Sequence, residues 1–316
     1  MSVPPKLSIV ILSWNVCTLL KKALASIFQS APVNTTHEVL VVDNASSDGS
    51  VQMVRNLFPQ VRLINNDTNL GFTKGNNLGM TLARGDHILL LNPDTEIVGD
   101  ALDALIRYLD THQDVGLVGP RLLNPDGTQQ SSRRRFPSVP ILFLESTWLE
   151  GLAPRALLDH YTVRDRSAAV DQNVDWITGA AMLVRRTVIE QVGLLDEGFF
   201  MYSEELDWCH RIRSAGWQIA YTPAAEIIHY GGKSSDQVAS SRHIYFQSSK
   251  VRYTQKYHGA LVAELLRGSL LAQYLWQCGL ETLKWVLGHR RPLRAARIAA
   301  YWRVILSGLR SPSRIG

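Results

Sequence analysis

The sequence predicts an α/β fold in which a mostly parallel sheet is flanked by helices. Short apolar runs alternate with longer segments of helical character, as they do in successive strand–helix–strand units. Polar residues cluster directly after the apolar runs, where open α/β sheets bind their ligands. The 316 residues are 46% hydrophobic and 19% charged. This composition suits one large or two small globular domains and excludes a disordered, collagen-like or polytopic membrane protein.

Strands and helices are expected to alternate regularly over the first part of the chain. The expected strands are the apolar runs at residues 7–12, 38–42, 61–65 and 87–91. The expected helices follow them, ending at about residue 30 and covering residues 50–58, 75–84 and 100–112. This alternation predicts strand–helix–strand units whose strands lie parallel in one sheet.

The middle of the chain is less regular. Between residues 120 and 170, Arg133–Arg135 lie beside two prolines, which indicates a loop. A strand is then expected over residues 175–185 and a helix over residues 187–192. A second helix over residues 204–215 closes at Gly216, and a strand follows over residues 217–222.

The last part of the chain differs in charge and pattern. Residues 260–316 contain nine Lys and Arg and two Glu, whereas the preceding part is close to neutral. A nucleic-acid-binding surface is therefore not expected on the body of the protein. Leu and Trp recur at helical spacing in residues 261–287 and 293–309, which predicts two basic amphipathic helices. We expect a catalytic domain over residues 1–258 and a basic amphipathic helical tail over residues 259–316.

The tail and the cysteines bear on where the protein works. The tail either packs on the domain or on a sister subunit, or binds an anionic membrane surface. The three cysteines are far apart and form no metal or disulfide pattern, so reduced thiols in the cytoplasm are expected. The N-terminus does not resemble a signal peptide, and no apolar stretch approaches the roughly 18 residues of a membrane helix. The protein is therefore expected in the cytoplasm, free or at the inner face of the plasma membrane.

Two polar motifs follow expected strands. Asp43 ends the second strand, where a carboxylate can bind a nucleobase or a ribose hydroxyl, or can simply form a turn. In Asn92-Pro93-Asp94, two oxygen ligands stand two residues apart after the fourth strand. This spacing suits a hard divalent cation that also holds phosphate oxygens, although the same tripeptide forms ordinary turns.

Two further motifs occur near the C-terminal end of the expected domain. Glu204, Glu205 and Asp207 lie at the start of a helix, where they favour the helix dipole or, by repelling one another, provide a general base of raised pKa. His229 precedes Gly231-Gly232-Lys233-Ser234 and is either structural or a metal ligand with phosphate contacts after it. This segment is not a P-loop, because Ile227 stands where that pattern requires glycine.

In this order and spacing, the motifs resemble those of the family 2 glycosyltransferases, which are inverting enzymes with a GT-A fold. The nearest resemblance is to the rhamnosyltransferase-like branch that builds bacterial cell-surface polysaccharides. It covers about residues 6–258. The matching segments are SIVILSWN, VVDNASSDGS, NLGFTKGNNLG, LLLNPDTE, WITGAAMLVRR and GFFMYSEELDWCHRIRSAGW.

The resemblance implies a metal-dependent transfer of a sugar from a UDP- or dTDP-sugar, with dTDP-L-rhamnose the best match. The implied acceptor is a hydroxyl of a glycan or of a polyprenyl-diphosphate-linked saccharide in cell-wall or surface polysaccharide synthesis. The implied contacts of the nucleotide sugar are Asn15, Asp43, Asn44, Asn69, Gly71, Lys74, Asn76, Asn92 and Asp94. The implied contacts on the acceptor side are Trp176, Gly179, Ala180 and Asp207.

The resemblance also implies a cation and a catalytic base. Asp94, with His229 and Asn92, would hold Mg²⁺ or Mn²⁺. Glu205 stands at the position of the family's catalytic Asp, and the choice between Glu204 and Glu205 as the base stays open. The chain departs from the family pattern in two places, because Asn92 replaces the first Asp of the DxD motif and Glu205 replaces Asp.

Two other enzyme classes fit less well. A sugar-1-phosphate nucleotidyltransferase would need a Gly- and Arg-rich loop where Ser13-Trp14-Asn15 stands. A dehydrogenase would need GxGxxG after the first strand. The alternative from another class is a non-catalytic relative that binds a nucleotide sugar or a glycan, and the complete set of Asp43, Asp94, Glu205 and His229 argues against it. The acceptor and the oligomeric state, including a homo-oligomer, stay open.

Overall fold

The computed structural model describes residues 4–32, 35–231 and 239–310. The Gly232–Ser234 part of the glycine motif therefore lies outside the described residues. The chain divides into two compact units. The first unit is formed from residues 1–136, 159–197 and 204–234 and contains the sheets. The second is formed from residues 137–158, 198–203 and 235–316 and is helical. The sequence boundary expected between residues 258 and 259 stays a prediction.

The strands and helices that the apolar runs predict occur in the expected order, together with others that the runs did not predict. The strands are β1 Leu7–Ser13, β2 His37–Asp43, β3 Arg62–Asn65, β4 His87–Leu91, β5 Thr95–Val98, β6 Val115–Leu123, β7 Arg133–Arg134, β8 Gln172–Val174, β9 Trp176–Ile177, β10 Ala181–Arg185 and β11 Gln218–His229. The helices are α1 Cys17–Gln29, α2 Ser50–Leu57, α3 Phe72–Leu82, α4 Ala101–Thr111, α5 Val139–Leu144, the 3₁₀ helix Glu150–Leu152, α6 Arg155–Tyr161, α7 Arg186–Val192, α8 Glu204–Ser214, α10 Ala239–His258, α11 Ala260–Val286 and α12 Arg291–Ser307.

Two expectations about the middle of the chain are wrong. Arg133 and Arg134 form strand β7 rather than a loop, because they pair antiparallel with β9. The single strand expected over residues 175–185 is instead two strands, β9 and β10, which belong to different sheets. The break between them falls at Gly179, beside the acidic residues at the start of α8.

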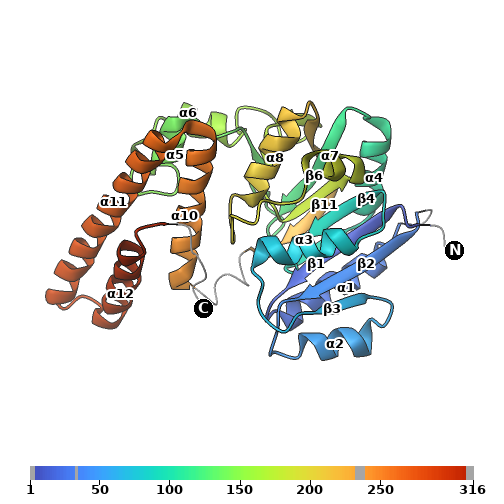
Figure 1. Ribbon diagram of the computed structural model, residues 1–316, viewed down its shortest axis with the longest axis horizontal. Coiled ribbons are helices and arrows are strands. Elements are labelled where there is room, and N and C mark those ends of the chain that lie inside the picture. The colour runs from blue at the N-terminus through green and yellow to red at the C-terminus, as the bar shows by residue number, and fades with distance from the viewer. Residues whose placement is uncertain (1–3, 33–34, 232–238, 311–316) are drawn as a thin grey trace. The chain divides into compact units, whose positions relative to one another are not determined.

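The main sheet of the first unit has the strand order β3-β2-β1-β4-β10-β6-β11-β5, and β8 also pairs with β11 (Figure 1). Strands β3, β2, β1 and β4 are mutually parallel, as are β6 and β11. Strand β10 runs antiparallel between β4 and β6. The expected α/β fold is confirmed, and the carboxyl ends of the parallel strands meet at one edge of the sheet.

Alternate residues of β1 face the two helical layers, as the strand pleat requires. Ile9 and Ile11 belong to the buried core that α1 and α4 share with the sheet. Val10 faces the other side, where α3 lies close because Gly79 has no side chain. A Cβ on Gly79 would lie 2.3 Å from Val10 Cγ1. In the NLGFTKGNNLG segment, Gly79 therefore allows close helix–sheet packing, in addition to the ligand contacts expected of this segment.

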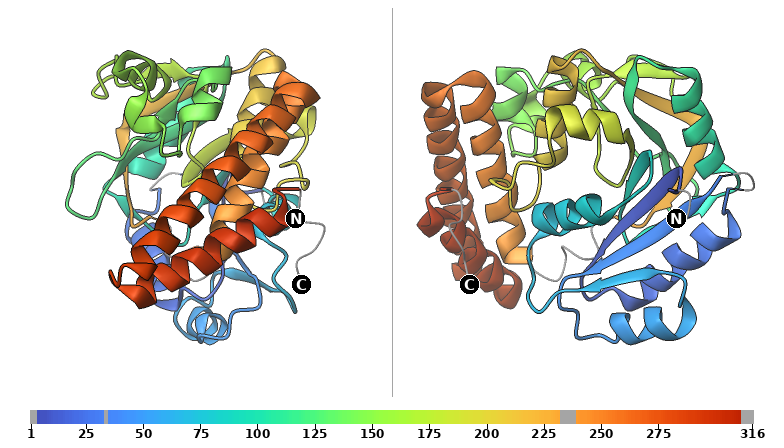
Figure 2. Two further views of the ribbon diagram at one scale, coloured as in Figure 1. Left: turned by 90° about the vertical axis from the view of Figure 1, so that its left-hand side faces the viewer. Right: turned by 45° about the vertical axis from the view of Figure 1, so that its right-hand side comes forward.

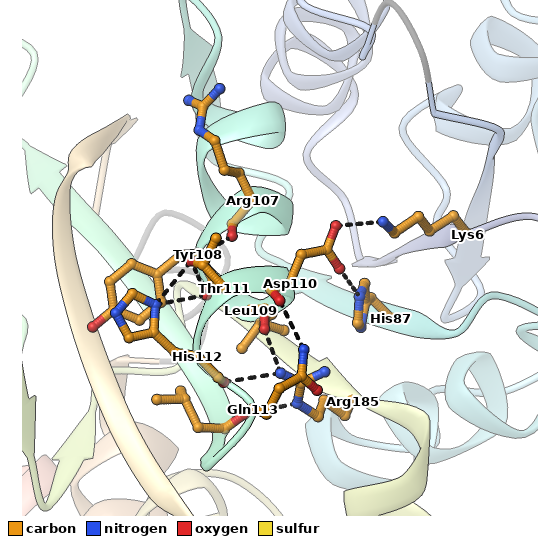
Figure 3. Close-up of polar contacts among 11 residues, drawn as sticks. Lys6, His87, Arg107, Tyr108, Leu109, Asp110, Thr111, His112, Gln113 and Arg185 are labelled. Carbon is orange, nitrogen blue, oxygen red and sulfur yellow. Dashed lines mark hydrogen bonds and ion pairs between the residues drawn. The ribbon is translucent and has the colours of Figure 1, made fainter.

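The opposite edge of the sheet is closed by a polar network (Figure 3). Arg185, at the end of β10, donates hydrogen bonds to the carbonyl oxygens of Leu109 and His112 at the end of α4. Asp110 pairs with Lys6 and lies 3.5 Å from Nε2 of His87. These contacts satisfy the last carbonyls of α4, which have no partner within the helix. The network is structural and lies at the sheet edge opposite the strand-end motifs.

The second unit is built from helices α10, α11 and α12, which Figure 2 shows side by side, with α11 and α12 forming an antiparallel hairpin. Glu281 on α11 is buried and pairs with Arg294 on α12 at 2.7 Å. The segment before α8 is held by α10, since Ser249 donates to the carbonyl oxygen of Met201 at 2.8 Å. Over the described ranges, the model contains no helix with the length and apolarity needed to span a membrane.

Candidate active site

The strand-end residues expected from the sequence gather at the carboxyl edge of the sheet. The parallel register places Ser13 of β1 beside Asp43 of β2, and Asp43 beside Asn65 of β3. Asn92 follows β4, the neighbour of β1 on its other side. One edge of the first unit therefore contains the residues of three sequence motifs.

Asp43 carries a buried acceptor oxygen with no partner. One carboxylate oxygen, Oδ1, accepts the backbone N–H of Ser46 at 2.8 Å. The other, Oδ2, is buried and has no hydrogen-bond partner among the residues that the structure describes. Asn15 closes the same turn, because its side-chain oxygen accepts the backbone N–H of Ser47 at 2.8 Å and its φ is +51°. An N–H or O–H donor on a ligand would satisfy Asp43 Oδ2.

The asparagines near Asp43 hold the surrounding loops. Asn44 is buried and donates to Asn69 Oδ1 at 3.2 Å and to the carbonyl of Gly71 at 3.1 Å. Asn76 is buried and donates to a backbone carbonyl one helical turn earlier. Lys74 is exposed, and its ammonium lies 3.8 Å from a carboxylate oxygen of Glu197. Of the residues expected to contact the nucleotide sugar here, Lys74 is the one that presents a positive charge to solvent.

Buried Asp94 and half-buried His229 form a pair of potential metal ligands. Asp94 lies between β4 and β5, and His229 ends β11, which pairs with β5. The imidazole Nε2 lies 3.5 Å from Asp94 Oδ1 and has no hydrogen-bond partner in the described part of the chain. A cation between or beside the two groups would satisfy both, so these residues fit a divalent metal ion. Asn92 is fixed by a backbone hydrogen bond from its N–H to Ala180 O at 2.9 Å.

The two groups do not by themselves complete a coordination shell. Among residues 4–32, 35–231 and 239–310, no cluster of three or more His, Cys, Asp or Glu side chains is placed to hold a metal ion. Mg²⁺ and Mn²⁺ commonly take one or two protein ligands and complete their shell with substrate phosphates and water. The Asp94–His229 pair therefore suits a cation that binds together with a diphosphate.

The two glutamates at the start of α8 differ in burial and in the influences on their pKa. Glu204 is buried, whereas Glu205 is only half-buried. Burial, and then the charge of Glu205, raise the pKa of Glu204 well above its ordinary value. Burial also raises the pKa of Glu205, but backbone hydrogen bonds and the charge of Arg134 counteract it. The proton is thus favoured on Glu204 and the charge on Glu205.

The backbone that enters α8 is strained. Tyr202 and Ser203 directly precede Glu204, and their φ angles are +70° and +62°. Left-handed conformations of such residues cost about 1–3 kcal/mol each and persist where the surrounding structure imposes them. The Oε2 atom of Glu205 is buried without a hydrogen-bond partner among the described residues. An acceptor hydroxyl would supply the missing donor.

Residues expected on the acceptor side surround Glu205. A Cβ on Gly179 would lie 3.6 Å from Glu205 Cβ, and Ala180 is buried. Trp176 pairs with Arg134 across β7 and β9, and the guanidinium lies 6.0 Å from its ring centre. The Trp176 indole is almost fully buried and donates to a backbone carbonyl at 2.9 Å. Gly179 therefore places no side chain against Glu205, while the Trp176 ring lies beside the Arg134 guanidinium.

Asp207 contacts an arginine of its own helix. Its carboxylate is fully buried and accepts a hydrogen bond from Arg211 Nε at 2.9 Å. Arg211 in turn donates to the carbonyls of Val192 and Leu194. Asp207 orients an arginine that holds the end of α7, and its contact with an acceptor stays a prediction.

Sequence reasoning missed two residues of the site. Arg134 appeared only as part of a basic run, and Gln130 was not singled out. Gln130 makes hydrogen bonds to both the ring and the backbone of His229, which is 99 residues away in the sequence. Since neither residue belongs to a local pattern, only the fold reveals these contacts.

Comparison with known proteins finds relatives among the glycosyltransferases. The family model described as glycosyl transferase family 2 matches residues 8–193. The N-acetylglucosaminyl-diphospho-decaprenol L-rhamnosyltransferase of Mycobacterium tuberculosis is 31% identical over 268 residues, which are 79% of this chain and 86% of that protein. The rhamnosyltransferase WbbL of Escherichia coli is 28% identical over 192 residues, 58% of this chain and 69% of the relative.

A solved structure shares the fold at low sequence identity. The mannosyltransferase PcManGT of Pyrobaculum calidifontis, solved in complex with GDP-Man and Mn²⁺, aligns with a TM-score of 0.56 and 15% identity. The alignment covers 97% of this chain and 88% of that structure. The likeness confirms the expected GT-A fold.

Proposed function

The chain belongs to glycosyl transferase family 2, and we propose that it is a metal-dependent inverting enzyme that transfers L-rhamnose from dTDP-L-rhamnose to a saccharide hydroxyl. The observation that carries the proposal is the acidic pair, in which Glu205 is half-buried with a partnerless oxygen while burial raises the pKa of Glu204 well above its ordinary value. A base of this kind is what attack by a hydroxyl requires. The choice of rhamnose is supported by the two rhamnosyltransferases among the relatives.

Glu205 acts as the general base in this mechanism. Its Oε2 accepts the proton of the acceptor hydroxyl while that oxygen attacks the anomeric carbon of the donor. The new C–O bond forms as the bond from the same carbon to the diphosphate oxygen breaks, so the configuration inverts in one displacement. No covalent sugar–enzyme intermediate is needed. Buried Cys209, with a pKa raised to about 12 by burial, stays a neutral thiol beside the base.

The carboxyl edge of the sheet binds the donor. Asp43 Oδ2 accepts an N–H of the base or a ribose hydroxyl, and Lys74 adds positive charge for phosphate at the start of α3. Asp94 and His229, with Asn92 nearby, would hold Mg²⁺ or Mn²⁺. Such a cation, when bound, neutralises the charge that develops on the leaving nucleoside diphosphate.

The acceptor is proposed to be a sugar linked to a polyprenyl diphosphate, in cell-wall or surface polysaccharide synthesis. The relative from Mycobacterium tuberculosis is named for an acceptor of this type. Such an acceptor resides at a membrane, so the chain is proposed to work from the cytoplasmic side as a peripheral protein. The helical unit supplies a surface suited to that role.

The outward side of α11 is apolar along its length. Leu261, Leu265, Leu275, Leu283 and Leu287 are all exposed, at intervals that keep them on one side of the helix. Residues 282–310 contain seven Lys and Arg and no Asp or Glu. Exposed Leu and Trp next to unbalanced basic residues suit the interface of an anionic bilayer.

Vesicle flotation tests the membrane part. The full chain should float with vesicles that contain phosphatidylglycerol and much less with neutral vesicles. Trp285→Ser with Leu287→Ser should reduce flotation, and Leu152→Ser, at an exposed leucine outside α10–α12, should not. Equal flotation of all three proteins, or none, would contradict the proposed membrane role while leaving the catalytic proposal intact.

Release of nucleoside diphosphate tests the reaction. The purified full chain would be incubated with a polyprenyl-diphosphate-linked GlcNAc and one donor at a time, in the presence of Mn²⁺ or EDTA. The donors are dTDP-L-rhamnose, UDP-glucose, UDP-galactose and UDP-GlcNAc. Turnover of dTDP-rhamnose that needs Mn²⁺ and is lost in Asp94→Ala and Glu205→Gln is the expected result. Turnover of a UDP-sugar instead would overturn the donor assignment alone. Binding without turnover of any donor would favour a non-catalytic relative.

A further inference from the structure

Gln130 is held in one orientation by its amide partners. Its Nε2 donates to the backbone carbonyl of His229 and to Asn124 Oδ1, both at 2.8 Å. Because both partners are oxygen acceptors, the NH₂ group must face them. The amide oxygen Oε1 therefore faces Nδ1 of His229, 2.9 Å away.

The partners of Gln130 are oriented in turn by an exposed carboxylate. Asp126 Oδ1 accepts the hydroxyl hydrogen of Thr128 at 2.6 Å. Thr128 Oγ1 then accepts an N–H of Asn124 at 2.9 Å, which turns Asn124 Oδ1 toward Gln130. A carboxylate can only accept, so every hydrogen bond in this series points the same way. Hydrogen bonds from Thr128 keep the pKa of Asp126 below its ordinary value, which keeps it an acceptor.

This polarity has a consequence for the ring of His229. An amide oxygen is an acceptor, so Nδ1 must carry the hydrogen. Nε2 is then left with a lone pair, and it is this atom that faces Asp94 at 3.5 Å without a hydrogen-bond partner in the described residues. In the other tautomer, Nε2–H would instead be a donor directed at Asp94 and could not bind a cation.

We infer that Gln130, oriented by Asn124, Thr128 and Asp126, is a positioning residue that fixes His229 as the Nδ1–H tautomer and so makes Nε2 a cation ligand beside Asp94. The inference rests on the proposed function only for the identity of the cation. It assigns a role to the turn at residues 124–130, which the sequence motifs did not include. The hydrogen bond also restrains the ring orientation, since Gln130 bonds both to Nδ1 and to the backbone carbonyl of His229 at the end of β11.

Nitrogen NMR of the full-length, EDTA-treated protein with ¹⁵N-labelled histidine reads the tautomer directly. The signal of His229 is identified by its loss in His229→Gln. At a pH where the ring is neutral, wild type should show a protonated Nδ1 and an unprotonated Nε2. Gln130→Glu keeps an acceptor for Nδ1–H and should retain this pattern. Gln130→Leu should shift it toward Nε2–H, which then donates to Asp94.

Gln129→Leu is the matched control, because it makes the same chemical change at the preceding, exposed residue. Its His229 spectrum should equal that of wild type. Mn²⁺ binding in the presence of dTDP, followed by electron paramagnetic resonance, should weaken about 10- to 100-fold in Gln130→Leu and stay within about threefold in Gln129→Leu. Thermal unfolding of each variant reports whether the fold is retained.

An Nε2–H tautomer in wild type would overturn the inference, and that spectrum decides even where Gln130→Leu does not fold. A wild-type spectrum and unchanged Mn²⁺ affinity in folded Gln130→Leu would overturn it as well. Neither readout requires a donor sugar or turnover. Failure of the proposed reaction is therefore distinguishable from failure of the positioning role.

Discussion

Replacing Glu204 by Gln and replacing Glu205 by Gln are the same chemical change at adjacent positions, but we expect a large loss of activity from the second only. Glu204 is buried and its pKa is raised well above the ordinary value, so Gln resembles the protonated form that burial favours. Glu205 must be ionised to accept a proton, and Gln cannot accept one in the same way. Loss of a general base costs about 10²–10⁴-fold in kcat, whereas Glu204→Gln should stay within about threefold of wild type.

Glu204→Gln should also change how stability depends on pH. The pKa of Glu204 is higher in the folded chain than in the unfolded chain, where it is about 4.3. The stability contributed by protonated Glu204 is therefore fully present below about pH 4 and is lost as the pH rises toward the folded-state value. The loss is about 1.4 kcal/mol for each unit by which the pKa is raised. Gln does not titrate, so the variant should gain stability relative to wild type as the pH rises.

Urea unfolding at pH 5 and pH 8 measures this difference, and nucleoside diphosphate release measures kcat. The free energy of unfolding of Glu204→Gln minus that of wild type should be larger at pH 8 than at pH 5. If that difference does not change with pH, the proton is not held on Glu204. If Glu204→Gln loses as much activity as Glu205→Gln, the assignment of the base to Glu205 is wrong.

Three further outcomes are expected. Replacing Arg134 by Met should move the acidic limb of the pH profile of kcat/KM to higher pH, because its charge favours ionised Glu205; the same change at exposed Arg164 should leave the profile unaltered. Gly85→Ala should lower the free energy of unfolding in urea by about 1–3 kcal/mol, since a Cβ there would lie 2.6 Å from a backbone nitrogen of β1; an unchanged midpoint would refute this packing. Asp207→Ala should cost about 2–4 kcal/mol in thermal unfolding, because its arginine partner keeps its burial and loses its counter-charge; a melting temperature equal to that of wild type would show that the pair contributes nothing.

The sequence predicts the parallel half of the sheet well because its strands are uninterrupted apolar runs. β1, β2 and β4 each contain four consecutive apolar residues that are buried, Ile9–Leu12, Val39–Val42 and Ile88–Leu91, so the runs stand out. β6 was missed although it is one of the longer strands. Its segment contains Gly116, Gly119 and Pro120, which read locally as turn residues. Gly119 is required because a Cβ there would lie 2.2 Å from Ile177, a contact that only the fold creates.

In the candidate site, too, residues within local sequence motifs could be predicted and residues outside them could not. Asp43, Asp94 and Glu205 are found from sequence because each stands at the end of a strand or the start of a helix, in a short motif. Gln130 and Arg134 lie in a segment whose composition resembles a loop, and their partners are far away along the chain. Local pattern therefore predicts the groups that we propose to carry the chemistry, whereas the residues proposed to orient them depend on tertiary pairing.

One short backbone segment links the cation side of the site to the base. Ala180 accepts a hydrogen bond from the backbone N–H of Asn92, which lies two residues before Asp94. The preceding residue, Gly179, hydrogen-bonds through its backbone to Glu205. An in-line displacement needs the base and the leaving diphosphate on opposite sides of the anomeric carbon, at a fixed separation. Because Gly179 and Ala180 are consecutive and run directly into β10, which pairs with β4, we expect the central sheet to set the separation between the proposed base and the proposed cation ligands.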